Sequence, residues 1–335
     1  MPTLRKPYLL YLGDARLKSD CKTAFGLRDW SRADVLGEWS HPDGRVTLGL
    51  PRLSPAQAAA QGAGSVVIGV APTGGQLPAH WQDDLEGALA AGLDVVSGLH
   101  TRLRDLPRLR AAAEKAGVRL IDVRHPTQEF AVASGRKRSG RRVLTVGTDC
   151  ALGKKYTALA LTRALAAAGV PATFRATGQT GILIAGSGIA VDAVVADFIA
   201  GAAETLSPDA SPEHWDVIEG QGSLYHPAYA AVTVGLLHGS QPDAIVLCHD
   251  PGRTHIEEYP DYPIPDLALV IDAYLRLGRL TNPAIRCVGL SINSSALTEP
   301  EWDAYRARLA RELALPVCDP LRGGVAALVD ALRGV

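Results

Sequence analysis

The residues with the clearest chemistry lie in one run, VLTVGTDCALGKKYTALALTRALAAAGV, at positions 143–170. An apolar stretch at 143–146 leads into a loop that ends at Gly153, and Lys154 opens an Ala/Leu-rich stretch typical of a helix. Strand, glycine loop, lysine and helix follow one another in this order in a phosphate-binding P-loop. Loop N–H groups, the helix dipole and the lysine charge all attract phosphate. The run therefore predicts that the protein binds a phosphorylated small molecule.

The loop departs from the usual P-loop pattern in two ways. Five residues separate Gly147 from Gly153, where the usual pattern has four, and Lys155 stands where a Mg²⁺-binding hydroxyl is expected. Thr157 lies two residues further on. A second cation at this point favours a diphosphate held by charge over Mg²⁺-dependent ATP hydrolysis. The residues expected to bind the cofactor are Gly147, Thr148, Asp149, Cys150, Ala151, Leu152, Gly153, Lys154, Lys155, Tyr156 and Thr157.

Polar clusters follow several apolar runs that read as strands: TGQTG at 177–181, EGQGS at 219–223 and HDPGR at 249–253. In a parallel sheet such clusters converge on one edge, where ligands bind. The expected catalytic residues are Glu219, His226, His249 and Arg253. The expected substrate-binding residues are Thr177, Gln179, Thr180, Gln221, Ser223 and Arg253, and Asn293 is expected to contact an adenine edge. Structural alternatives are a helix-capping or solvated Glu219, a buried structural His226 and a surface ion pair for Arg253.

Alternating strands and helices are predicted on both sides of a basic, glycine-containing segment at 133–142, ASGRKRSGRR, which reads as a linker. The pattern predicts an α/β protein with two domains. Residues 1–138 are expected to form a Rossmann-like parallel sheet domain. Residues 139–335 are expected to form a doubly wound α/β domain of the P-loop NTPase type.

Composition narrows the function classes. The 335 residues carry a net charge of −1, which offers no electrostatic case for nucleic acid or an anionic membrane as partner. Five cysteines are scattered without a Cys-x₂-Cys pair, so neither a zinc site nor a disulfide framework is indicated, and we expect no metal. Without a signal peptide or a membrane-spanning apolar run, the chain is predicted to be cytoplasmic. A small-molecule substrate and a homo-oligomer are expected.

The motifs GTDCALGKK, TGQTG, EGQGS and HDPGR together resemble a two-domain family first described as of unknown function and now called D-glutamate N-acetyltransferase-like. The resemblance extends into the N-terminal part through VVIGVAPTGGQLP and GLDVVSGLH. It implies binding of acetyl-CoA and acetylation of the amino group of D-glutamate. The P-loop domain alone is also similar to dethiobiotin synthetase, which implies ATP with Mg²⁺ and a ligase or kinase activity. A non-catalytic nucleotide-binding protein is the third hypothesis.

Acetyl transfer sets requirements that the residues can be matched to. Only a free amine attacks a thioester, so a base is needed, and Glu219, His226 and His249 are the candidates, with Asp149 a weaker one. Arg253 suits a carboxylate of the acceptor, because its planar fork makes paired hydrogen bonds. Amides of the glycine loops are candidate donors to the developing oxyanion.

Overall fold

A computed structural model describes residues 4–72, 75–126 and 128–335. The chain forms two compact units, of which the first comprises residues 1–127 and 179–193 and the second comprises 128–178 and 194–335. We expected a single boundary after residue 138. The division instead assigns residues 128–138 to the second unit and residues 179–193 to the first. In the part of the chain that is described, no helix is long and apolar enough to cross a membrane.

The first unit is built on a five-stranded parallel sheet in the order β2-β1-β3-β4-β5. Its strands are β1 Tyr8–Tyr11, β2 Val35–Trp39, β3 Ser65–Ile68, β4 Asp94–Ser97 and β5 Leu120–Asp122. Its helices are α1 Lys22–Trp30, α2 Pro55–Ala60, α3 Trp81–Ala90, α4 Pro107–Ala116 and α6 Gln179–Ala185. The strand order is that of a doubly wound sheet, as the alternating pattern predicts.

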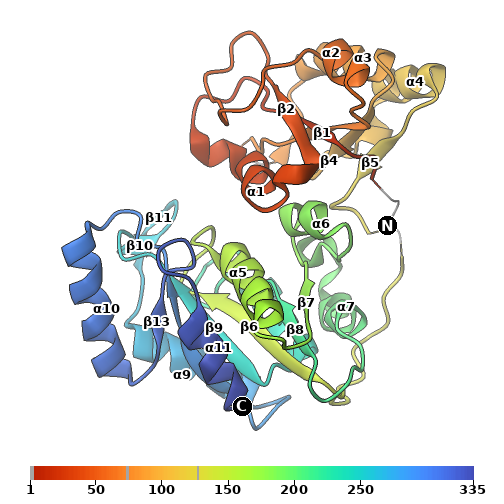
Figure 1. Ribbon diagram of the computed structural model, residues 1–335. Coiled ribbons are helices and arrows are strands. Elements are labelled where there is room, and N and C mark those ends of the chain that lie inside the picture. The colour runs from red at the N-terminus through yellow and green to blue at the C-terminus, as the bar shows by residue number, and fades with distance from the viewer. Residues whose placement is uncertain (1–3, 73–74, 127) are drawn as a thin grey trace. The chain divides into compact units, whose positions relative to one another are not determined.

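Helix α6 comes from the second half of the sequence but packs against α1 in the first unit (Figure 1). The Thr180 and Thr23 hydroxyls lie 2.8 Å apart in a buried hydrogen bond. The sequence pattern did not predict this helix, because its first residues belong to the TGQTG motif and include Gly181. The tertiary packing of Ile182 and Leu183, both buried, supplies what the local propensity lacks.

The second unit is built on a six-stranded parallel sheet in the order β13-β12-β9-β6-β8-β7. Its strands are β6 Arg141–Gly147, β7 Ala172–Arg175, β8 Trp215–Ile218, β9 Ala244–His249, β12 Arg286–Ile292 and β13 Val317–Cys318. A separate antiparallel hairpin pairs β10 His255–Ile256 with β11 Tyr259–Pro263. The helices are α5 Lys154–Ala167, α7 Ile199–Leu206, α8 Ala230–Ser240, α9 Leu267–Gly278, α10 Glu299–Leu313 and α11 Ala326–Arg333.

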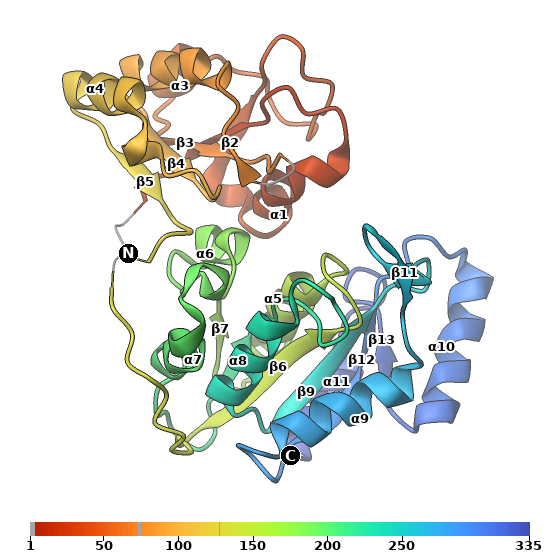
Figure 2. The ribbon, with the colours of Figure 1, turned by 180° about the vertical axis from the view of Figure 1, so that it is seen from behind.

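Alternate residues of the central strand β6 serve the two faces of this sheet. Val143 packs with α5 and α11 on one face, whereas Leu144 and Val146 pack with α7, α8, α9 and α10 on the other. Figure 1 shows α5 and α11 in front of the sheet, and Figure 2 shows α8 and α9 in front of it. Because both faces are covered, the middles of the strands are largely apolar, and the polar side chains gather toward the strand ends.

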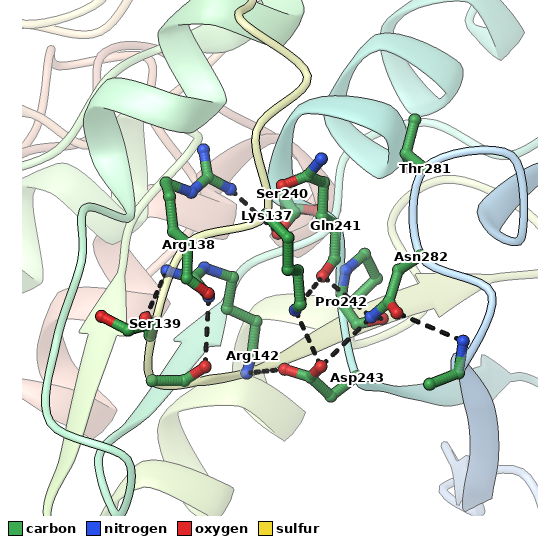
Figure 3. Close-up of polar contacts among 12 residues, drawn as sticks. Lys137, Arg138, Ser139, Arg142, Ser240, Gln241, Pro242, Asp243, Thr281 and Asn282 are labelled. Carbon is green, nitrogen blue, oxygen red and sulfur yellow. Dashed lines mark hydrogen bonds and ion pairs between the residues drawn. The ribbon is translucent and has the colours of Figure 1, made fainter.

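The basic segment that we predicted to be a linker is docked on the second unit through two buried arginines (Figure 3). Arg142 is 1% exposed and donates to carbonyls of Arg138 and Ser139 and to the Ser207 hydroxyl. Arg138 is also buried and donates to two carbonyls at the end of α8. Lys137 pairs with Asp243 at 2.8 Å. These cations lie at the amino ends of β6 and β9, opposite the P-loop, and serve the packing of the segment.

A close approach of backbone to helix α7 gives a test of this docking. A methyl group on Gly201 would lie 1.8 Å from the Ala131 carbonyl oxygen, whereas one on Gly87 of α3 would meet nothing within 4 Å. We expect Gly201→Ala to lower the free energy of unfolding by about 1–3 kcal/mol, because backbone must shift. Gly87→Ala, a matched change in a helix, should raise it by about 0.5–1 kcal/mol. Urea unfolding of both variants measures the difference, and equal stabilities would contradict the docked segment.

Candidate functional site

The P-loop predicted from the sequence joins the central strand β6 to α5 in the second unit. Helix α5 begins at Lys154, after Gly153, whose φ of 117° is open to glycine without strain. The Lys154 side chain is buried, and its Nζ donates a 2.7 Å hydrogen bond to the Asp149 carbonyl oxygen within the same loop. Burial lowers the pKa of Lys154. The ammonium group is therefore held inside the loop, where a phosphate oxygen can replace the carbonyl.

Gly220 of the EGQGS motif lies against the end of β6 and beside the Lys154 side chain. A methyl group on Gly220 would lie 3.1 Å from Cδ of Lys154 and 1.7 Å from the Thr145 carbonyl oxygen. The Gly220 N–H donates to the Thr145 hydroxyl at 3.0 Å. The glycine that follows β8 is thus required by the close approach of the backbone of β6, and it also leaves room for the Lys154 side chain.

The rest of the loop offers backbone more than side chains. Thr148 is buried and its N–H donates to the Cys248 carbonyl, while Leu152 packs inward at 2% exposure. Ala151 is exposed with a φ of 53°. The Lys155 ammonium lies 5.5 Å from the ring centre of Tyr156, and both residues are half-buried.

Asp149 is a hub that ties the loop to the chain after β9. Its carboxylate is fully buried and accepts the N–H groups of Cys150 at 2.6 Å and Glu257 at 2.9 Å. Arg253 donates to the same carboxylate at 2.8 Å and to the Cys150 carbonyl at 2.8 Å, and it pairs with Glu257 at 3.3 Å. The structure thus places Arg253 on the P-loop, between two acids, where its first effect is to neutralise Asp149.

Glu219 follows β8, directly beside β6. It is 4% exposed, and its Oε2 accepts the N–H groups of Thr177 at 3.0 Å and Gly178 at 3.1 Å. The Thr177 hydroxyl donates to the Glu219 carbonyl at 2.6 Å and accepts from Nε2 of Gln221 at 3.1 Å. Two strand ends therefore hold one carboxylate in a fixed orientation, which is the preparation that a positioned base requires.

His226 carries its proton on one particular nitrogen. Its Nδ1 accepts hydrogen bonds from the N–H groups of Ala228 at 3.1 Å and Tyr229 at 3.3 Å. A backbone N–H only donates, so Nδ1 is bare and the neutral ring has its hydrogen on Nε2. Burial lowers the pKa of His226 and keeps the ring neutral. This arrangement makes the ring a hydrogen-bond donor. It leaves His226 no free lone pair with which to act as the base that we predicted.

The same proton position bears on metal binding. Single donor atoms of Asp149, Cys150 and His226 lie within 4.8 Å of one another. A metal-bound histidine offers one bare nitrogen to the ion and donates from the other, whereas here the bare nitrogen is already occupied by backbone. Burial raises the pKa of Cys150, so its thiol is not prepared as a thiolate ligand. The three side chains do not fit a metal ion.

His249, the last residue of β9, is 7% exposed, and its Nδ1 lies 3.0 Å from the Thr148 hydroxyl. Burial lowers its pKa to about 4. The imidazole is neutral at physiological pH and is a weak base there, although it touches the loop.

Two expected site residues are held by other partners, and a third is buried. The Thr157 hydroxyl faces the core, where it donates to the Gly153 carbonyl and lies 2.7 Å from the Ser291 hydroxyl. The amide of Asn293 donates to Asp250 at 3.0 Å and accepts from the N–H of Ser295. Ser223 is fully buried.

The TGQTG motif is divided between the two units. Thr177 and Gly178 follow β7 and belong to the second unit, whereas Gln179 and Thr180 begin α6 and belong to the first. Gln179 lies over Gly98, where a methyl group would come within 2.7 Å of it. The motif is thus not one continuous loop, because its second half is the first turn of α6.

Two residues that contribute to the site were not predicted from the sequence. The Tyr274 hydroxyl, fully buried in α9, donates to the Gly147 carbonyl at 2.9 Å. A polar aromatic residue on the apolar face of a helix is the signal that points to it. Glu257 contributes through its backbone N–H. Every residue except proline has this group, so the residue type gives no signal in the sequence.

Comparison with known proteins agrees with this architecture. Residues 129–329 match the P-loop domain of the family described as the domain of unknown function DUF1611, and residues 38–126 match its Rossmann-like domain. The chain belongs to the DUF1611 family. A crystal structure of a DUF1611 protein from Anabaena variabilis is 35% identical, with a TM-score of 0.89 over 98% of this chain and 100% of that one. The predicted fold class is confirmed.

Two curated proteins are similar to this chain over nearly their whole length. One from Tritonibacter scottomollicae is 48% identical over 99% of this chain and 100% of its own. One from a Pseudoalteromonas species is 45% identical over 98% and 99%. Both are named D-glutamate N-acetyltransferase. The family resemblance recognised in the four motifs is confirmed.

The buried His249 of this DUF1611 protein predicts a pH dependence of stability. Its folded pKa of about 4 lies below the usual 6.5, so protonation favours the unfolded chain. Its contribution is complete above pH 6.5 and is lost as the pH falls from about 6.5 to about 4, a loss of at most about 3 kcal/mol. Urea unfolding between pH 7 and pH 4.5 should show a smaller decline for His249→Gln than for the native chain. Parallel declines would contradict a buried neutral imidazole.

Proposed function

We propose that this protein is an N-acetyltransferase that moves the acetyl group of acetyl-CoA to the amino group of D-glutamate. The observation that carries the proposal is the P-loop itself. It presents a buried lysine and backbone N–H groups, while the Thr157 hydroxyl points into the core, away from the loop. Such a loop suits a diphosphate held by charge, as in CoA, and the names of both curated relatives support the reaction and the acceptor.

The residues divide the work as follows. Lys154 and the loop N–H groups bind the diphosphate of the donor. Glu219, oriented by two backbone N–H groups, takes the proton that the acceptor ammonium must lose before its nitrogen attacks the thioester carbon. His226 offers Nε2–H as a donor beside the loop. The nitrogen adds to the thioester carbon, and as the carbon–sulfur bond breaks the second proton of the nitrogen passes to the sulfur, so that CoA leaves as the thiol.

An ATP-dependent ligase or kinase is not favoured. That chemistry places Mg²⁺ on the hydroxyl that follows the P-loop lysine, and the position here is Lys155. Asp149, a carboxylate within the loop that could otherwise bind Mg²⁺, is already paired with Arg253.

The proposal is tested with purified protein, acetyl-CoA and D-glutamate. We expect N-acetyl-D-glutamate and free thiol to form in equal amounts, with a rate that EDTA leaves unchanged, because charge and backbone hold the diphosphate. Lys154→Ala should raise the Kd of acetyl-CoA by roughly ten- to a hundredfold, the loss of a charged hydrogen bond. Lys115→Ala, an exposed lysine on α4, is the matched control and should bind normally. Product formation that requires ATP and Mg²⁺ would establish the ligase reaction instead.

Glu219→Gln tests the base. The amide keeps the shape of the side chain and loses the capacity to take a proton, so kcat should fall about 10²- to 10⁴-fold while the Kd of acetyl-CoA stays constant. Glu213→Gln changes an exposed carboxylate just before the other end of β8 and should leave kcat unchanged. A Glu219→Gln variant with native kcat would show that the proton goes elsewhere.

A further inference from the structure

Three tyrosines that the proposed reaction does not use are linked through the ring of His226 into one aromatic cluster beside the P-loop. Tyr229 lies just before α8, and Tyr259 and Tyr262 lie on β11. The ring of His226 is 4.5 Å from that of Tyr229 and 5.2 Å from that of Tyr259, and Tyr259 stands edge-on to Tyr262 at 6.0 Å. We call Tyr229, Tyr259 and Tyr262 the aromatic shelf.

The shelf is open to solvent at its outer members. Tyr229 is 55% exposed and Tyr262 is 49% exposed, whereas His226 beneath them is 3% exposed. Single exposed apolar side chains are ordinary on protein surfaces. Here the exposed rings are in contact with one another through Tyr259 and the buried ring of His226.

The shelf begins at the phosphate loop. The ring nitrogen of His226 lies within 4.8 Å of donor atoms of Asp149 and Cys150. The hairpin that carries Tyr259 and Tyr262 is tied to the loop, because the N–H of Glu257 donates to Asp149 and Arg253 pairs with both acids. Figures 1 and 2 show β11 at the same end of the sheet as the loop that leads into α5.

We propose that the aromatic shelf stacks the adenine ring of the acyl-CoA donor; this inference rests on the proposed function. In CoA one ribose separates the adenine from the diphosphate, so a diphosphate on the P-loop brings the base close to the loop. Aromatic side chains bind bases by stacking, without reading their edges. The adenine edge contact that the sequence assigned to Asn293 is not needed, and both ends of that amide already have partners.

The chemistry of the shelf distinguishes the base from the acceptor. Tyrosine rings stack on a flat π surface, which adenine has and D-glutamate lacks. Glu258 and Asp261 lie among the hairpin residues, and their carboxylates can accept a hydrogen bond from the exocyclic amino group of adenine.

The test compares Tyr262→Ala and Tyr229→Ala in the full-length protein with two donors. Loss of a stacking ring should raise the KM for acetyl-CoA, and the Kd of 3′-phospho-ADP by calorimetry, by about tenfold. S-Acetylpantetheine lacks the nucleotide, so its kcat/KM should not change. Tyr262→Phe keeps the ring and should behave as the native chain. Leu280→Ala, which removes a 72% exposed side chain after the far end of α9, is the control.

Each outcome decides one of the two proposals. An equal loss with S-acetylpantetheine, or native affinity for 3′-phospho-ADP in both alanine variants, overturns the adenine shelf. A native chain that binds 3′-phospho-ADP and transfers no acetyl group overturns the proposed reaction, while the calorimetric arm still decides the shelf. Failure of Tyr262→Phe to restore binding would assign the effect to the hydroxyl group and also overturn stacking.

Discussion

One buried carboxylate holds the candidate site together. Asp149 is fully buried, and a buried charge is tolerated only when it is paired and hydrogen-bonded. Its partners are Arg253 and the N–H groups of Cys150 and Glu257. Since these lie on the loop and on the chain after β9, the requirement to satisfy Asp149 joins the P-loop to the hairpin. The position of the aromatic shelf follows from that link.

The two histidines and Glu219 show how environment assigns chemistry to side chains that look equivalent in sequence. His226 is turned into a donor by two backbone N–H groups on Nδ1, and His249 is kept neutral by burial. Glu219 is oriented by two N–H groups of the neighbouring strand end. The candidate base is therefore distinguished by hydrogen bonding, which residue type alone does not reveal.

The structure also separates two sets of basic residues. Lys154 and Arg253 lie at the carboxyl end of the second sheet, where the helix dipole of α5 and the loop amides add positive potential. The second set, at the opposite end, comprises Lys137, Arg138 and Arg142. The two arginines donate to backbone carbonyls, and Lys137 is paired with Asp243. Only the first set is in a position to attract an anionic donor.

The sequence by itself determined the two α/β units, the P-loop and the strand ends at which polar residues gather, because local periodicity and glycine punctuation encode them. It did not determine which polar residues meet. The TGQTG motif gave no sign that its second half would start α6 in the other unit, nor that Arg253 would bind Asp149, 104 residues away. Those outcomes depend on pairing buried charges and burying apolar surface between distant segments, and only the tertiary structure brings such segments together.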